Sequence, residues 1–460
     1  MERVMVRCLL ERRTTLAQAD VRGLAHERPL LPYREGRQDR VGEPTRSCLG
    51  RVPGGSGAGR RAGAQPRPAR RAGARSPGRA RPPPRPLTRG AGRGFLPDTS
   101  TRAPPMHPSP TGMDLLTTPP PAAGEAEVVD ALQVHYGLAA RVSALPGERD
   151  RNLLVRCADG RHAVLKLSNA ADTAEARALG RAVLLHLDGR GPPFAVPRLI
   201  PTRAGAESCT VGDAEAVLTT FVAGRPWDAR PPSAALRRAV GGAAAALGAA
   251  LRGFDHPAAR RSLPWDLMRL DRMAPVADAM ADRRRGDWLA DFIARFAAEL
   301  RPAAAALPAA AVHNDLNGSN VLLRDGADAV AGVIDFGDLL HGPRVVDLAV
   351  ACTYGLGDAD PAEAVADFAE GWARAAPLAE AEAEALFDLA VARLALRVLM
   401  YEWRAVQACD DRGYAMRHAS AAYLALDHVM ALPRHRGRER VLARLGVRRG
   451  GPGSRPGTMP

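Results

Sequence analysis

The chain almost lacks lysine. Of its 64 lysine and arginine side chains only Lys166 is a lysine, so arginine fills the other basic positions. The six cysteines show no C-x-x-C spacing, which disfavours a zinc site or a disulfide framework and favours a reducing environment. No apolar run approaches the ~18–20 residues of a transmembrane helix, and MERVMVRCLLERR is a poor signal peptide because charges interrupt it. We therefore expect a cytoplasmic protein in which Lys166 has a particular role.

Basic charge is concentrated at the N-terminal end. Residues 1–112 contain 23 arginines and 8 acidic residues, a net charge of +15, whereas the whole chain carries +14, so residues 113–460 carry −1. This Arg-, Pro- and Gly-rich leader has no hydrophobic period and cannot bury enough apolar surface to fold, so we predict that it is disordered. It is either a segment that binds polyanions without specificity or an over-extended gene start before Met113. No recognition motif indicates specific nucleic-acid binding.

A compact set of polar residues lies between His313 and Asp338, in the stretches HNDLNGSN and GVIDFGD. Asp315 is placed to accept a proton from an incoming hydroxyl, and Asn320 offers an amide oxygen to a magnesium ion. Asp335 supplies a second, anionic ligand. The predicted strands VLLR and GVID, joined by the turn RDGADA, would bring Asn320 and Asp335 together beside Asp315. The pattern predicts Mg²⁺-dependent phosphoryl transfer.

Lys166 lies upstream, in the predicted strand HAVLKLS, which follows NLLVRC and the tight turn ADGR. A lysine on such a strand is the expected ligand of nucleotide phosphates, where a compact ammonium fits and a wide guanidinium does not. A further strand, AVLTTFVAG, ends where the backbone of Thr220 and Val222 could hydrogen-bond a nucleotide base. A plain core strand is the alternative for these two residues.

Beyond Gly224 the sequence has helical periodicity, over 232–254, 288–306, 361–375, 379–408 and 415–431. We predict an α+β, protein-kinase-like fold of two lobes. A small antiparallel-sheet N-lobe over 113–222 would bind the nucleotide. A helical C-lobe over 223–435 would carry the catalytic loop and the substrate pocket, and a disordered tail would follow over 436–460.

The motifs resemble the aminoglycoside phosphotransferase and choline kinase superfamily. The stretches LPGERDRNLLV, DGRHAVLKLSNA, HNDLNGSNVLL and GVIDFGDLLHGPRVVDLAVACTYGL are most similar to the hydroxylysine kinase branch, and the resemblance covers about residues 126–430. It implies ATP or GTP between the lobes, Asp315 as catalytic base, and magnesium on Asn320 and Asp335. It also implies transfer of a γ-phosphoryl group to a small amino alcohol, 5-hydroxylysine first.

The sequence departs from the family pattern in places. The usual His-Gly-Asp is His313-Asn314-Asp315, and the loop LPGERDRN keeps only Gly147 where relatives carry more glycine. The resemblance also implies an acidic partner for the strand lysine on the next helix. Glu175 is the acidic residue available there, although an acid at a helix start is also an ordinary feature.

Several neighbouring residues have open interpretations. Asp338 could hold a substrate ammonium or a second metal, or could cap the segment that follows it. Asp347 is expected to tie a helix start to the catalytic loop. Aromatic side chains also stand beside carboxylates in the C-lobe, which suits an ammonium substrate but is equally typical of core packing. These are Trp265 with Asp266, and Tyr401 and Trp403 with Glu402.

Other functions make different demands on the sequence. A protein kinase would carry a lysine two residues after the catalytic aspartate, where this chain has Asn317, and a long activation segment after D-F-G. Aminoglycoside, choline or ethanolamine, and homoserine kinases remain alternatives within the small-molecule group. A nucleotide-binding pseudokinase would be favoured by loss of a motif residue, and none is lost.

Overall fold

The first sheet along the chain is antiparallel and has five strands. The computed structural model describes residues 113–447, apart from 148 and 408–418, and these residues belong to a single compact unit. The strand order is β1-β2-β3-β5-β4. Their bounds are β1 Ala140–Leu145, β2 Arg151–Cys157, β3 His162–Leu167, β4 Cys209–Val211 and β5 Ala214–Thr220.

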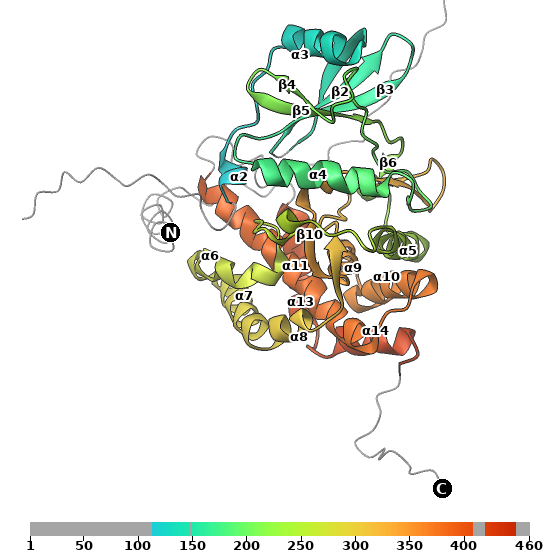
Figure 1. The fold of residues 1–460 in the computed structure, drawn as a ribbon. Helices are drawn as coiled ribbons and strands as arrows, with labels where there is room; N and C mark the ends of the chain where they lie inside the picture. Colours follow the sequence, from blue (N-terminus) through green and yellow to red (C-terminus); the bar gives the residue numbers. More distant parts are fainter. Residues whose placement is uncertain (1–112, 148, 408–418, 448–460) are drawn as a thin grey trace, which may run out of the picture. The chain divides into compact units, whose positions relative to one another are not determined.

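The register of the sheet decides which way Lys166 points. On β3, Leu165 and Leu167 are fully buried in a cluster with Val128 and Leu132 of the helical segment before β1. Successive side chains of a strand point to opposite faces, so Lys166 faces away from that cluster. Figure 1 shows helix α3 (Glu125–Ala131) against one side of the sheet and helix α4 (Ala174–Leu187) on the side toward the helical region. The predicted hairpin that delivers the lysine is confirmed.

The remainder is mainly helical. Its large apolar cluster joins α4 to the long, deeply buried α11 and to the helices around it. The bounds are α2 Asp114–Thr117, α5 Ala234–Ala250, α6 Ala274–Ala279, α7 Arg283–Arg295, α8 Arg301–Ala305, α9 Val346–Cys352, α10 Pro361–Ala375, α11 Glu380–Gln407, α13 Ala419–Ala431 and α14 Arg436–Arg444. The predicted α+β, protein-kinase-like class is confirmed.

Short strands flank the predicted catalytic segment. β8 (Val321–Leu323) pairs with β9 (Val330–Val333), as the sequence predicted, and with the two-residue strand β6 (Arg225–Pro226). β7 (Ala309–Val312) pairs with β10 (Leu340–Pro343). The segment HNDLNGSN therefore connects β7 to β8, and the D-F-G segment connects β9 to β10.

The predicted disordered tail is wrong over its first part. Residues 436–444 form helix α14, which packs on α10 and α11, and Val441 and Leu442 of this helix are buried. Residues 448–460 and the predicted leader, 1–112, lie outside the described residues. Within the described part, no helix combines the length and apolarity needed to cross a bilayer.

Candidate active site

A buried carboxylate holds the backbone of the predicted catalytic loop. Asp347, at the start of α9, accepts hydrogen bonds from the backbone N–H groups of His313 (2.9 Å) and Asn314 (2.7 Å). The predicted tie between this helix and the loop is confirmed. Asn314 has φ 65°, a left-handed conformation that glycine adopts freely and asparagine tolerates. The change from His-Gly-Asp to His-Asn-Asp therefore keeps the backbone path.

Asp315 is fixed by three side chains. Its Oδ2 accepts from the amide Nδ2 of Asn317 and of Asn320, each at 2.8 Å, and its Oδ1 lies 3.0 Å from Nη2 of Arg393. Asn317 also accepts from the N–H groups of Ser319 and Asn320, each at 2.9 Å, and so closes the turn. The residue that replaces the protein-kinase lysine thus shapes the loop.

The environment of Asp315 raises its pKa. Burial is the largest cause, Arg393 opposes it, and Asp338 and Asp335 add to it, so that the pKa rises to about 6. A carboxylate with this pKa is ionised at neutral pH yet basic enough to take part in proton transfer. Arg393 comes from α11, 78 residues along the chain, so no local sequence signal pointed to it.

The hairpin β8–β9 brings the two predicted metal ligands to one end. Val321 pairs with Val333, and the N–H of Ile334 donates to the carbonyl of Asn320 at 2.9 Å. Asn320, just before β8, and Asp335, just after β9, therefore lie at the same end of the hairpin. The Asn320 Nδ2 donates both to the carbonyl and to the carboxylate of Asp315, which leaves Oδ1 as the amide atom for a cation.

Asp335 is anionic and accessible. Its backbone is left-handed, with φ 62°, and its side chain is 44% exposed. The Lys166 ammonium, 3.3 Å from Oδ1, is the largest cause that holds the pKa of Asp335 well below its usual range. A charged carboxylate beside an amide oxygen is a hard donor set that fits magnesium completed by nucleotide phosphates. Among the described residues no three His, Cys, Asp or Glu side chains gather into a self-sufficient metal site.

Lys166 is paired with an acid that sequence reasoning missed. Its ammonium lies 2.8 Å from Oδ2 of Asp150, whose Oδ1 accepts from the N–H of Asn169 at 2.9 Å. Burial alone would raise the pKa of Asp150, but Lys166 and Arg149 outweigh it and lower that pKa. The register was the available signal: Asn152 lies opposite Lys166, so Asp150, just before β2, falls beside the lysine.

The prediction that Glu175 pairs with Lys166 is therefore wrong. Glu175 lies in the first turn of α4, exposed to solvent, and interacts with the Thr173 side chain that caps this helix. An acid in the first helical turn is stabilised by the helix dipole, which is the ordinary interpretation of this residue.

A second cation, from the loop LPGERDRN, lies beside the D-F-G segment. Arg149 is buried and lies 2.8 Å from Oδ1 of Asp338. Asp338, which sequence left open among three roles, is thus an ion-pair partner of the loop. Gly147, in the same loop, has no space for a side chain, because a Cβ there would lie 2.7 Å from the carbonyl of Asp150. The loop LPGERDRN therefore has a single glycine, Gly147, and places the guanidinium of Arg149 beside Asp338.

The two residues predicted to bind the nucleotide base differ in what they offer. The backbone N–H of Thr220 donates to the carbonyl of Arg198 at 2.9 Å, and its hydroxyl accepts from the Arg198 N–H at 3.0 Å, so this amide is committed within the protein. Val222 lies in the stretch between β5 and β6 and is buried. Its contact with a nucleotide stays a prediction.

Comparison with known proteins identifies the family. The profile described as the phosphotransferase enzyme family matches residues 141–387, more than half of the chain. The chain belongs to this family. It is 24% identical over 336 residues to hydroxylysine kinase of Mus musculus, which covers 66% of this chain and 88% of that protein. Hydroxylysine kinase of Danio rerio is also 24% identical, over 313 residues, covering 64% and 88%. The predicted resemblance is confirmed, and the chain is a small-molecule kinase.

A solved structure shows the same fold. The microcompartment-associated aminopropanol kinase has a TM-score of 0.50 and 19% sequence identity, and the match covers 70% of this chain and 99% of that one. The match supports the same arrangement of a sheet followed by a mainly helical region.

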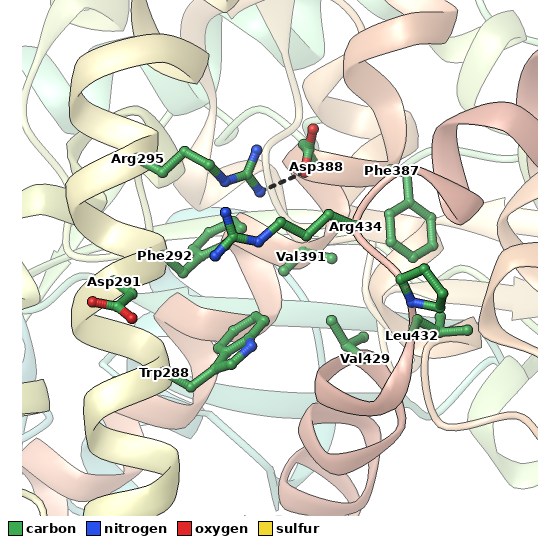
Figure 2. A pocket seen from close by; sticks show the side chains of 11 residues that line it. Trp288, Asp291, Phe292, Arg295, Phe387, Asp388, Val391, Val429, Leu432 and Arg434 are labelled. Carbon is green, nitrogen blue, oxygen red and sulfur yellow. Dashed lines mark hydrogen bonds and ion pairs between the residues drawn. The ribbon is translucent and has the colours of Figure 1, made fainter.

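This phosphotransferase also has a hollow away from the catalytic loop, between α7, α11 and the end of α13 (Figure 2). Trp288 and Phe292 stack there with ring centroids 5.4 Å apart, and Arg295 lies 2.9 Å from Asp388. The catalytic loop contributes no residue to its lining. Since the acceptor hydroxyl must reach Asp315, we do not assign the acceptor to this hollow.

Proposed function

We propose that this kinase transfers the γ-phosphoryl group of ATP or GTP, with Mg²⁺, to the hydroxyl of a small amino alcohol. The first candidate acceptor is 5-hydroxylysine, because the two relatives described above, each matched over 88% of its length, are named hydroxylysine kinase. The observation that carries the proposal is the juxtaposition of Asp315, Asn320, Asp335 and Lys166 in one site.

Each residue has a role that its surroundings support. Lys166, held between Asp150 and Asp335, would orient the nucleotide phosphates. Asn320 and Asp335 would hold magnesium, which neutralises charge that develops on the transferred group. Asp315 aligns the acceptor hydroxyl and accepts its proton, and its amide and guanidinium partners keep the carboxylate in one orientation.

Membership of the phosphotransferase family supports a nucleoside triphosphate as the donor, and the choice between ATP and GTP belongs to the same proposal. Because the Thr220 amide is committed to Arg198, Val222 is the residue we propose to contact the base through its backbone. A cytoplasmic location is part of the same proposal and follows from the scattered cysteines of the sequence.

The test is mass-spectrometric detection of phosphorylated product with magnesium and either ATP or GTP. The acceptors are 5-hydroxylysine, choline, ethanolamine, homoserine and kanamycin, and Asp315→Asn is the blank. We expect product from 5-hydroxylysine that the variant does not make. Product from another acceptor alone would replace the hydroxylysine assignment. Nucleotide binding without product from any acceptor would favour a pseudokinase.

A further inference from the structure

Two arginines of α11 border the catalytic aspartate. Arg393 and Arg397 are four residues apart, so they lie on the same face of the helix. Arg393 is almost fully buried and bonds Asp315 at 3.0 Å. The helix face that carries both arginines is therefore beside the position that an acceptor hydroxyl must take to reach Asp315.

Arg397 is a cation without a matching anion. Its guanidinium carbon lies 4.4 Å from the centroid of the Tyr354 ring. Burial disfavours its charge, but Tyr354, Tyr401 and Asp315 outweigh this and raise the pKa of Arg397, so the side chain stays charged. In the part of the chain that the structure describes, Arg397 forms no ion pair with a carboxylate. Arg397 is half-buried, and a guanidinium that is partly withdrawn from water and faces no carboxylate is suited to bind a ligand of opposite charge.

The two carboxylates that the sequence offered for an ammonium, Asp266 and Glu402, have partners within the protein. Asp266 accepts from the N–H of Met268 at 3.0 Å and lies 3.2 Å from Arg269. Glu402 accepts a hydrogen bond from the Tyr423 hydroxyl.

The aromatic face of this region is engaged as well. The guanidinium carbon of Arg393 lies 5.1 Å from the Trp265 ring centroid, and that of Arg404 lies 5.3 Å from it. Trp265 thus faces two arginines, Asp266 caps the segment after it, and Trp403 is part of the core. Three guanidinium groups, those of Arg393, Arg397 and Arg404, lie on this part of α11, which favours an acceptor that carries an anionic group.

We propose that the acceptor carries a carboxylate, that Arg397 binds it, and that the acceptor hydroxyl meets Asp315 at the same time. This inference rests on the proposed function. A guanidinium is suited to the task because its planar fork can bind both carboxylate oxygens. Hydroxy amino acids such as 5-hydroxylysine and homoserine satisfy the requirement, whereas choline, ethanolamine and aminoglycosides do not.

The experiment compares acceptors that differ only in the carboxylate. The pairs are 5-hydroxylysine with 1,5-diaminopentan-2-ol, and homoserine with 3-aminopropan-1-ol. Calorimetry measures their binding to the full chain loaded with magnesium and a non-hydrolysable ATP or GTP analogue, and mass spectrometry measures product with the natural nucleotide. We expect at least one carboxylate-bearing acceptor to bind about 10- to 100-fold more tightly than its counterpart.

Variants assign the preference to Arg397. We expect Arg397→Gln to lose this 10- to 100-fold preference and Arg397→Lys to keep part of it, with nucleotide affinity unchanged in both. Arg374→Gln, on the exposed face of α10, is the matched control and should retain wild-type binding. Because the acceptor pairs are compared first on the wild-type protein, the test does not depend on the folding of any variant.

The outcomes separate this inference from the proposed function. Equal binding of both members of each pair, or no binding of either carboxylate-bearing acceptor, would overturn the inference. A preference that survives in Arg397→Gln would overturn the role of this residue. Carboxylate-selective binding without phosphorylated product would support the recognition and reject the proposed reaction.

Discussion

Lys166 is held by two carboxylates with different environments. Asp150 is almost fully buried beside it, whereas Asp335 is partly exposed and faces the proposed magnesium site. The buried acid fixes the ammonium in place, so that the exposed acid remains available to the metal. This division assigns a positioning role to Asp150, which does not itself need to touch the nucleotide.

We predict that Asp150→Asn raises the KM for the nucleotide about 10- to 100-fold, because Lys166 loses a charged hydrogen-bonding partner. Steady-state kinetics with varied nucleotide would measure this. The matched control is Glu175→Gln, which removes the exposed acid at the start of α4 and should leave the KM unchanged. An equal effect of the two substitutions would contradict the assignment.

The pKa of Asp315 predicts the acid side of the pH profile. Only the ionised carboxylate accepts a proton, so with a pKa of about 6 the acceptor kcat/KM should fall about tenfold per pH unit below that value. Arg393 lowers this pKa, and we expect Arg393→Gln to move the acid limb to higher pH. Kinetics across pH would check both statements. An acid limb that does not move in the variant would reject the coupling of Arg393 to Asp315.

The sequence made several of these residues predictable because their spacing is local. Asp315, Asn320 and Asp335 belong to one loop and one hairpin, so period and turn residues were enough to place them. Asp150 was within reach of the same reasoning, through the register of β2 and β3. By contrast, Arg393 contacts Asp315 through the packing of α11, which no local pattern encodes.

Among the elements, α5 and α10 pack closely through glycine. A Cβ on Gly241 would lie 2.0 Å from the carbonyl of Phe368, and a Cβ on Gly371 would lie 2.0 Å from the carbonyl of Arg238. The backbones of the two helices therefore meet without intervening side chains. This contact lies next to Arg237 and Arg238 of α5, which are paired with Asp367 of α10.

We predict opposite effects of alanine at two helical glycines. Gly371→Ala should reduce the free energy of unfolding by about 1–3 kcal/mol or more, because backbone must move to admit the methyl group. Gly180→Ala on α4, where nothing lies within 4 Å of the new Cβ, should increase it by about 0.5–1 kcal/mol. Chemical denaturation of both variants would measure this, and a stabilised Gly371→Ala would contradict the close crossing.

Helix α14 lies where the sequence analysis predicts a disordered tail. Its sequence is rich in arginine and has few apolar residues. In the structure its charges are matched, since Arg444 lies 2.9 Å from Asp367 and Arg440 pairs with Glu363, both on α10. Two buried apolar residues and this tertiary pairing are enough to hold a short helix that has little apolar sequence of its own.

At the scale of the whole molecule, charge is distributed unevenly along the chain. Residues 1–112 carry +15 and residues 113–460 carry −1. We predict that the full chain binds heparin or RNA with an affinity that falls steeply as salt is added. A chain of residues 113–460 should not bind either polyanion. The two chains should have equal kcat/KM. Binding assays at two salt concentrations and steady-state kinetics would check this. Lost activity in the shorter chain would show that the leader contributes to catalysis.

Transfer of a radiolabelled γ-phosphate tests the central claim most directly. Full-length wild type and Asp315→Asn would be incubated with magnesium, labelled ATP or GTP, and 5-hydroxylysine. We expect labelled phosphohydroxylysine from the wild type, at a rate about 10²- to 10⁴-fold above that of the variant. Label found only in inorganic phosphate, or equal product from both proteins, would contradict the assignment of Asp315 as the base of a small-molecule kinase.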